Sequence, residues 1–215
     1  MEEKNFSCVD CMVNGCGEDE DGRYPEFCLT SHLDERVKAR AMKHYREEEN
    51  FRIMEAAADV EYEGYCVWPR VREIAEFAKK MGYHKIGVAS CVGLIREARA
   101  AAEIFRSHGL EVYGTACKVG AVPKTEVGLD PKYNQVGCNM CNPILQAELL
   151  NEVDTELNVV VGLCVGHDSL FIKYSQAPVT TLVTKDRVTG HNPAAALYNM
   201  DSYFGSRVFG EKKQK

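Results

Sequence analysis

Short apolar stretches alternate with helical patterns in the second half of the chain, and this alternation constrains the fold more than any other feature of the sequence. The predicted strands span residues 85–90, 111–116, 158–163 and 179–184. Between them, apolar residues recur at the three- and four-residue spacing of helices. Strands that alternate with helices form a parallel sheet covered on both faces. The sequence therefore predicts an α/β fold with a Rossmann-like or flavodoxin-like parallel sheet of about four strands.

The residues before this sheet are predicted to form two further parts. Residues 1–31 contain few aliphatic side chains, so they cannot close a core of their own and we expect metal to order them. Residues 32–65 show a helical pattern from about residue 32 to residue 61. A second helix is predicted over 69–81, because Pro69 suits a first turn and Gly82 suits a helix end. The predicted organisation is a cysteine-rich metal-binding segment (1–31), a helical connector (32–65) and an α/β domain (66–215).

Charge and hydropathy exclude several classes of function. The formal net charge of −6 provides no basic field for a phosphate backbone, so we expect no nucleic-acid partner. No apolar run reaches the roughly 18–20 residues of a membrane span, and we expect no membrane partner. Residues 1–8 are acidic and lack the apolar stretch of a signal peptide, which predicts a cytoplasmic protein. In that compartment disulfides are rare, and the ten cysteines need another explanation.

Four cysteines crowd into the amino-terminal segment with the spacing Cys8-x2-Cys11-x4-Cys16-x11-Cys28. Buried cysteines that act as small hydrophobes explain scattered positions but not such a cluster. Structural zinc prefers two close pairs or added histidines, whereas this segment has one close pair. The uneven gaps and the distant fourth cysteine resemble iron–sulfur spacing more closely. We therefore expect a [4Fe–4S] cluster here, with zinc as the alternative.

A second cysteine group follows the predicted strands. Cys91, Cys117 and Cys164 each come directly after one of the first three strands, at the edge where parallel sheets bind ligands. If the first strand lies between the second and third, these residues are within about 10 Å of one another. The loop over 118–142 adds Cys138 and Cys141 as a close pair. Five cysteines are thus available where a second [4Fe–4S] cluster needs four, and the choice between Cys138 and Cys141 stays open.

Polar residues follow the same strand ends. We predict a catalytic role for five of them: His167, Asp168, Lys185, Asp186 and His191. Lys118 and Asn142 are predicted to contact the cofactor. Such groups beside a metal are typical of a substrate site. Each also has a plain structural interpretation, such as a helix cap for Asp168. Cys66 has no such context, and we predict that it is structural.

Several motifs together resemble a known family. They are Ile86-Gly87-Val88-Ala89-Ser90-Cys91-Val92-Gly93-Leu94, Cys117-Lys118-Val119-Gly120, Cys141-Asn142-Pro143-Ile144-Leu145-Gln146-Ala147, Gly162-Leu163-Cys164-Val165-Gly166-His167-Asp168, Lys185-Asp186-Arg187 and His191-Asn192-Pro193. In these the chain resembles domain-of-unknown-function family 1847, over nearly its whole length. The resemblance implies a metal-binding protein of the kind found in bacteria and archaea, often anaerobic ones. It implies no particular reaction.

Three functions compete on these observations. The first is an iron–sulfur protein of anaerobic metabolism, with a redox or sulfur-related role and either a redox partner protein or a small-molecule substrate. The second is a zinc protein without redox chemistry, in which the α/β domain binds a small molecule or a partner. The third is a metal or sulfur carrier, favoured by the surplus of Cys138 and Cys141. Whether the chain is an enzyme stays open at this point.

Overall fold

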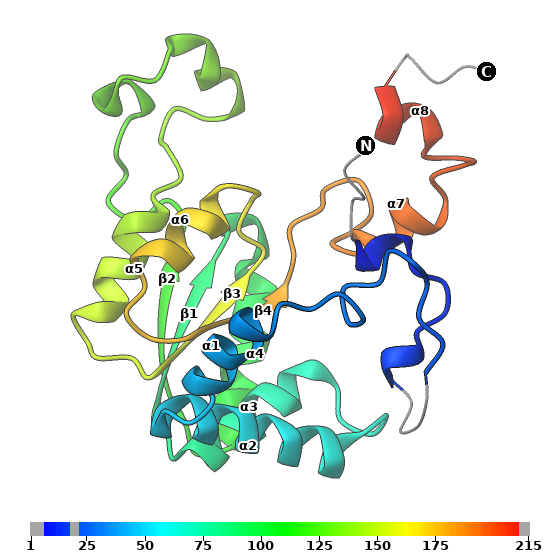
Figure 1. Ribbon diagram of the computed structural model, residues 1–215. Helices are drawn as coiled ribbons and strands as arrows, with labels where there is room; N and C mark the ends of the chain where they lie inside the picture. Colours follow the sequence, from blue (N-terminus) through cyan, green and yellow to red (C-terminus); the bar gives the residue numbers. More distant parts are fainter. Residues whose placement is uncertain (1–6, 18–21, 211–215) are drawn as a thin grey trace. The chain divides into compact units, whose positions relative to one another are not determined.

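The computed structural model describes residues 7–17 and 22–210 (Figure 1). The chain divides into two compact units, Met1–Ala57 and Ala58–Lys215, and the boundary falls within helix α2 (Glu48–Gly64). The first unit contains the four amino-terminal cysteines. The second contains a four-stranded parallel sheet with helices, so the predicted α/β fold is confirmed.

The sheet consists of β1 (Lys85–Ser90), β2 (Glu111–Ala116), β3 (Leu157–Val161) and β4 (Val179–Val183). The order is β2-β1-β3-β4 and every pairing is parallel. β1 therefore lies between β2 and β3, which is the order assumed above for the second cysteine group. Ser90 at the end of β1 is paired with Ala116 on one side and Val161 on the other. The ends of three strands consequently meet at one edge of the sheet, at the switch point where α/β proteins bind ligands.

Helices cover both faces of this sheet (Figure 1). They are α3 (Arg70–Met81), α4 (Ile95–Ser107), α5 (Pro143–Asn151) and α6 (His167–Tyr174). The side chain of Val88 borders the same groove as Ala98 of α4, whereas a Cβ on Gly87 would meet Leu150 of α5. Neighbouring residues of a strand face opposite sides, so α4 and α5 lie on opposite faces. α3 packs with α4, and α5 packs with α6.

The predicted helix over 69–81 is confirmed in detail. Pro69 is the N-cap residue of α3, and Gly82 ends the helix with a left-handed φ of 73°. Glycine adopts this conformation without the steric cost that a side chain brings. One face of α3 buries Ile74 and Ala78, and its apolar spacing is what the sequence pattern indicated.

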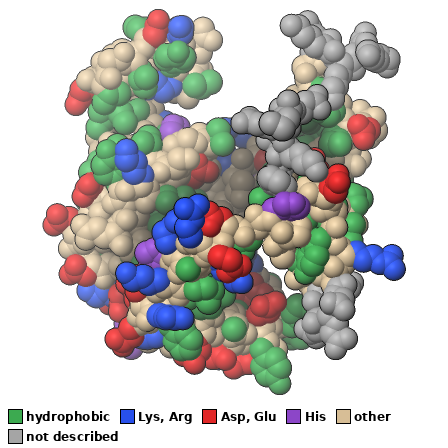
Figure 2. Space-filling view, in the orientation of Figure 1, with side chains coloured by type: hydrophobic (Ala, Val, Ile, Leu, Met, Phe, Trp, Pro, Cys, Tyr) green, Lys and Arg blue, Asp and Glu red, His purple; other side chains and the backbone are tan. Residues whose placement is uncertain are grey.

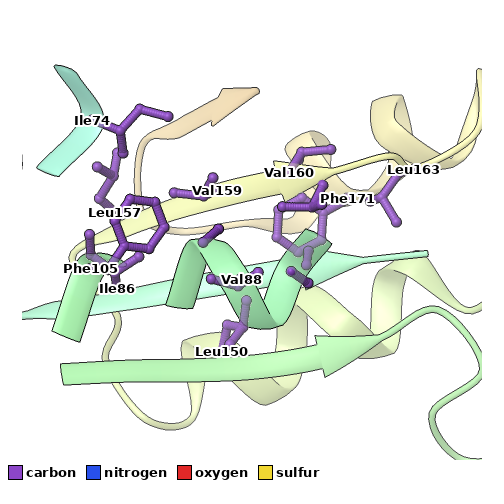
Figure 3. Packing of buried hydrophobic residues seen from close by; sticks show 14 of the residues in the cluster. Ile74, Ile86, Val88, Phe105, Leu150, Leu157, Val159, Val160, Leu163 and Phe171 are labelled. Atoms are coloured by element: carbon purple, nitrogen blue, oxygen red, sulfur yellow. The ribbon is translucent and has the colours of Figure 1, made fainter. Parts of the chain in front are cut away.

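Fully buried aromatic and branched side chains form the core of the second unit (Figure 3). The ring of Phe105 from α4 lies near Ile86 of β1 and Leu157 of β3, and Phe171 of α6 lies near the opposite end of the cluster (Figure 3). Burial of one such side chain contributes about 1.5–3 kcal/mol to stability. This core fixes the strands, and through them the positions of the residues at their ends.

The first unit holds two short 3-10 helices, η1 (Cys8–Asp10) and η2 (Gly15–Gly17), followed by α1 (Glu35–His44) and α2. The helical pattern over residues 32–61 is thus divided into two helices. α1 begins at Glu35 because the Asp34 carboxylate accepts a hydrogen bond from the Arg36 amide at 2.8 Å. Between the helices, the Asn50 side chain donates to the His44 carbonyl at 3.0 Å and supports the turn.

A long excursion of the chain joins β2 to α5, and residues 118–142 of it are called the arm below. The arm contains the 3-10 helices η4 (Lys124–Val127) and η5 (Pro131–Val136). Its two sides are held together by an antiparallel bridge between Pro123 and Asn139. Hydrophobic side chains, in green, are visible on the arm at the upper left of Figure 2, and Val127 and Val136 are among the exposed ones.

Two short helices, α7 (Ala194–Tyr198) and α8 (Gly205–Phe209), follow the sheet. The first begins directly after its N-cap residue, Pro193. None of the helices formed by residues 7–17 and 22–210 combines the length and apolar character needed to cross a lipid bilayer.

Candidate functional site

A pocket of about 550 Å³ lies at the carboxyl edge of the sheet and is called the edge pocket below. Its lining includes four cysteines from four segments of the second unit: Cys91, Cys117, Cys141 and Cys164. Cys91 directly follows β1, Cys117 directly follows β2, and Cys164 lies three residues beyond β3. The fourth cysteine, Cys141, comes from the end of the arm. The structure therefore brings together four of the five cysteines predicted to meet here.

Backbone hydrogen bonds extend the sheet to the first two cysteines. The Cys91 amide donates to the Val161 carbonyl at 3.1 Å, and the Cys117 amide donates to the Ser90 carbonyl at 2.8 Å. The sulfur of Cys117 in turn accepts a hydrogen bond from the Val92 amide at 3.4 Å. Both cysteines are buried, so they are held by the same ladder that forms the sheet.

A tight turn positions Cys164. Gly162 has a φ of 69°, and a Cβ there would lie 2.7 Å from Leu94, so glycine is needed at this close approach. The Cys164 carbonyl then accepts hydrogen bonds from the His167 and Asp168 amides as α6 begins. Its sulfur accepts a hydrogen bond from Arg187 Nη2 at 3.1 Å. This contact with Cys164 raises the pKa of the Arg187 guanidinium.

The remaining thiol, Cys141, interacts with two neighbours in the pocket. The Cys117 thiol and the His167 ring both form hydrogen bonds to it, and these, in that order, lower the pKa of Cys141. The same contact with Cys141, together with burial, raises the pKa of Cys117. The pKa of His167 is raised, chiefly by its hydrogen bond to Cys141. The arrangement favours a Cys141 thiolate beside an imidazolium and a protonated Cys117.

Cationic side chains surround these sulfurs. Lys118, Lys124, Lys185 and Arg187 all line the edge pocket, and within the described part of the chain its lining contains no Asp or Glu. Lys118 Nζ donates to the Asn139 carbonyl at 2.6 Å, and Lys124 Nζ donates to the Tyr133 carbonyl, so both also hold the two sides of the arm together. The other walls are apolar and include Leu129, Val136, Met140, Ile144 and Leu170.

The predicted polar site residues divide into two sets. His167, Lys185, Lys118 and Asn142 line the edge pocket. Asp168, Asp186 and His191 do not.

The residues of the second set form hydrogen bonds to their neighbours in sequence. The Asp186 carboxylate accepts hydrogen bonds from the Val188 and Thr189 amides. The backbone amide of Asp186 donates to His191 Nδ1 at 3.1 Å. Asp168 accepts from the Ser169 amide. The Asp186 contacts form a turn. Asp168 lies in the first turn of α6, whose N-cap residue is Gly166, so it is not the helix cap that the sequence allowed.

Asn142 has a structural contact as well as a place in the pocket. Its Oδ1 accepts a hydrogen bond from the Leu145 amide at 3.1 Å, which makes it the N-cap of α5. Cys138 is exposed and lies outside the pocket lining, where its carbonyl accepts from the Lys124 amide. Cys66 is likewise exposed and outside the lining, with a left-handed φ of 55°.

The amino-terminal cysteines belong to the first unit. Cys8 and Cys16 are exposed, whereas Cys11 and Cys28 are partly buried. Hydrogen bonding from the Ser31 amide lowers the pKa of Cys28. Residues 18–21, which lie between Cys16 and Cys28, are outside the described residues.

All ten cysteines carry free thiols. In the described ranges 7–17 and 22–210, no three His, Cys, Asp or Glu side chains are arranged to hold a metal ion. In the edge pocket, Cys117 and Cys141 are hydrogen-bonded to each other, and the four thiols come from four separate segments.

Two residues of this site were not predicted as site residues, although both lie within the motifs that resemble the family. Gln146 is fully buried on α5, and its Nε2 donates to the carbonyls of Ser90 and Thr115, which ties the ends of β1 and β2 together. Gly93 lines the edge pocket, and a Cβ on it would lie 3.3 Å from Lys185 Nζ and 3.8 Å from Cys91 Sγ. For Gln146, a further signal is its polar side chain among the apolar residues that follow Pro143.

Comparison with known proteins finds the family that the sequence motifs resemble. Residues 28–182 match the family described as Protein of unknown function (DUF1847). The chain is also similar to the uncharacterized protein MJ0455 of Methanocaldococcus jannaschii, with 48% identity over 163 residues, which covers 75% of this chain and 83% of that protein. The family match includes all four cysteines of the edge pocket and begins at Cys28, so it leaves out the three cysteines before it. On this match, the chain belongs to the DUF1847 family.

Proposed function

We propose that the edge pocket holds a cysteine-ligated iron–sulfur cluster. The observation that carries the proposal is that four thiols from four separate segments line one pocket at the switch edge of a parallel sheet. Cysteine thiolates are the usual ligands of such clusters. Cys91, Cys117, Cys141 and Cys164 are the proposed ligands, and exposed Cys138 is left out of the set.

The surroundings of the four thiols fit a cluster better than a single ion. A cluster offers a separate iron atom to each ligating cysteine, which suits four thiols that come from four separate segments. Thiolates and a cluster together carry negative charge, and Arg187, Lys118, Lys124 and Lys185 offset it without a competing carboxylate in the described lining. When bound, such a cluster supplies one-electron transfer or a Lewis-acidic iron. His167 and the cations orient and neutralise a molecule in the pocket.

We also propose a second iron–sulfur cluster on Cys8, Cys11, Cys16 and Cys28, whose support is their spacing in the sequence. The ten free thiols support a reducing, cytoplasmic environment. The protein would then act in anaerobic metabolism with a redox partner or a small-molecule substrate.

The test is the iron, zinc and acid-labile sulfide content of the protein purified without oxygen, recorded together with its visible spectrum. About eight irons with matching sulfide per chain are expected for two [4Fe–4S] clusters. Zinc without sulfide would overturn the iron–sulfur proposal and leave the non-redox zinc protein as the function to pursue.

A further inference from the structure

We propose that the edge pocket binds a small organic anion, with its acidic group on Lys185 beside Cys91 and its apolar part against the arm. The inference rests on the proposed function, because it assigns a ligand to the same pocket. It adds a class of ligand: an aliphatic carboxylate, sulfonate or phosphate ester.

The electrostatics of the pocket favour an anion. The chain as a whole is acidic, with a formal net charge of −6, yet three lysines and an arginine line this pocket and no described lining residue is acidic. Cations concentrated in a partly enclosed site attract anionic ligands more strongly than the same charges on an open surface. The charge of the pocket is therefore opposite to that of the chain.

Lys185 is the cation best placed to receive the ligand. Arg187 donates to Cys164, while Lys118 and Lys124 donate to carbonyls of the arm. Among the described residues, Lys185 Nζ has no hydrogen-bond or ion-pair partner, although the side chain is half-buried. A half-buried ammonium without a partner gains most from an added anion.

Gly93 leaves the space in which the acidic group fits. The position that a Cβ on Gly93 would take lies 3.3 Å from Lys185 Nζ and 3.8 Å from Cys91 Sγ. Because glycine has no side chain, this position between the ammonium and the sulfur stays open. An acidic oxygen there contacts Lys185 and lies against Cys91.

The rest of the pocket selects an apolar body. Leu129, Val136 and Met140 of the arm, with Ile144 and Leu170, form walls without charge. The volume of about 550 Å³ is within the range of small-molecule sites, roughly 300–1,000 Å³. A bare inorganic anion leaves these walls uncovered, so a ligand with both parts is favoured.

The test uses calorimetric titration of the anaerobically purified full-length protein with hexanoate, hexane-1-sulfonate and hexyl phosphate. Hexan-1-ol is the neutral control and acetate is the anion without an apolar body. At least one hexyl anion is expected to bind about ten-fold or more tightly than both controls. If none of the three binds at millimolar concentration, or if hexan-1-ol binds equally well, the proposal is wrong.

Two matched pairs of variants locate the site. Lys185→Gln is expected to weaken the hexyl anion about ten-fold or more, while Lys173→Gln, which removes the same charge from the exposed face of α6, leaves the affinity unchanged. Gly93→Ala fills the proposed position of the acidic group and is expected to abolish binding. Gly114→Ala, whose Cβ meets nothing within 4 Å, is expected to bind like the parent. Equal effects within either pair would overturn the assignment.

Metal content measured on the same samples separates the two proposals. Lys185-dependent binding to a protein without iron and sulfide would sustain the anion site and overturn the cluster. An iron–sulfur protein whose anion affinity is the same in Lys185→Gln would sustain the cluster and overturn the anion site.

Discussion

The side-chain nitrogen of Gln146 lies 2.8 Å from the carbonyl oxygen of Thr115, deep beneath the edge pocket. The same nitrogen donates to the Ser90 carbonyl at 3.2 Å. One buried side-chain amide therefore joins the ends of β1 and β2 to helix α5. Cys91 and Cys117 are the residues that follow Ser90 and Ala116 at these strand ends. The distance between two of the proposed ligands therefore depends on a side chain that is not part of the pocket lining.

Gln146→Met is expected to lower the free energy of unfolding by about 1–3 kcal/mol, because it leaves the Ser90 and Thr115 carbonyls without this donor. Urea denaturation of the metal-free protein measures the change. Glu148→Met, on the exposed side of the same helix, is the control and is expected to change stability by less than about 0.5 kcal/mol. Equal losses in the two variants would show that the bridge contributes nothing to stability.

Asn142 was predicted from the sequence as a cofactor contact, and the structure adds its role as a helix cap. Asn142→Ala removes the acceptor for the Leu145 amide and is expected to cost about 1 kcal/mol of unfolding free energy. Asn142→Asp keeps an acceptor at the cap, so its stability is expected to match the parent. Thermal or urea unfolding distinguishes them, and an Asp variant as unstable as the Ala variant would contradict the capping role.

The contacts of Cys141 predict a pH dependence in the metal-free protein. Hydrogen bonds from Cys117 and His167 lower the Cys141 pKa, so its thiolate persists as the pH falls below the usual range of a cysteine. His167→Gln removes one of these contacts, raises that pKa and is expected to slow alkylation of Cys141 by iodoacetamide at about pH 6. Mass spectrometry of the modified peptide gives the rate.

The control for this experiment is His84→Gln, which changes an exposed histidine of the same unit outside the edge pocket. It is expected to leave the alkylation rate of Cys141 unchanged. A pH–rate profile that is identical for the parent and His167→Gln would rule out the Cys141–His167 contact as its cause.

Gly87 in the middle of β1 has a packing requirement that its strand position alone does not reveal. A Cβ there would collide with the Asn158 side chain and lie 2.8 Å from Leu150 Cδ1. Asn158 is fully buried and bonded to Thr155, so it cannot move away cheaply. Gly87→Ala is expected to lower unfolding free energy by roughly 1–3 kcal/mol, measured by urea denaturation. Gly114→Ala in β2 is the control, and a loss of the same size there would contradict the packing explanation.

Local sequence pattern was sufficient to predict the sheet. β1 and β2 coincide with the predicted residues, because each is a short apolar run between a helix end and a cysteine. Gly82 similarly marked the end of α3. The strand order was assumed from a common α/β arrangement, and the structure has that order, with Cys91, Cys117 and Cys164 in the lining of one pocket.

Contacts between segments distant in sequence were beyond such reasoning. Nothing in the pair Cys138 and Cys141 indicates which of them faces the pocket, because that depends on how the arm folds against the strand ends. Asp186 and His191 follow a strand end, as pocket residues do. The Asp186 backbone amide nevertheless donates to the His191 ring, and the two residues form a turn. Spacing assigns a residue to an edge of the sheet, whereas the direction of its side chain depends on tertiary packing.

The division of the cysteines into two groups gives the sharpest test of the proposed metal sites. Cys91→Ser and Cys164→Ser each remove one thiol from the edge pocket, whereas the amino-terminal cysteines lie in the other compact unit. Each variant is therefore expected to lose about half of the iron and sulfide of the parent and to keep the rest. Cys66→Ser, which changes an exposed cysteine outside the pocket, is the control and is expected to keep the full content. Loss of all the metal in Cys91→Ser, or of none, would mean that the two groups do not bind separate centres.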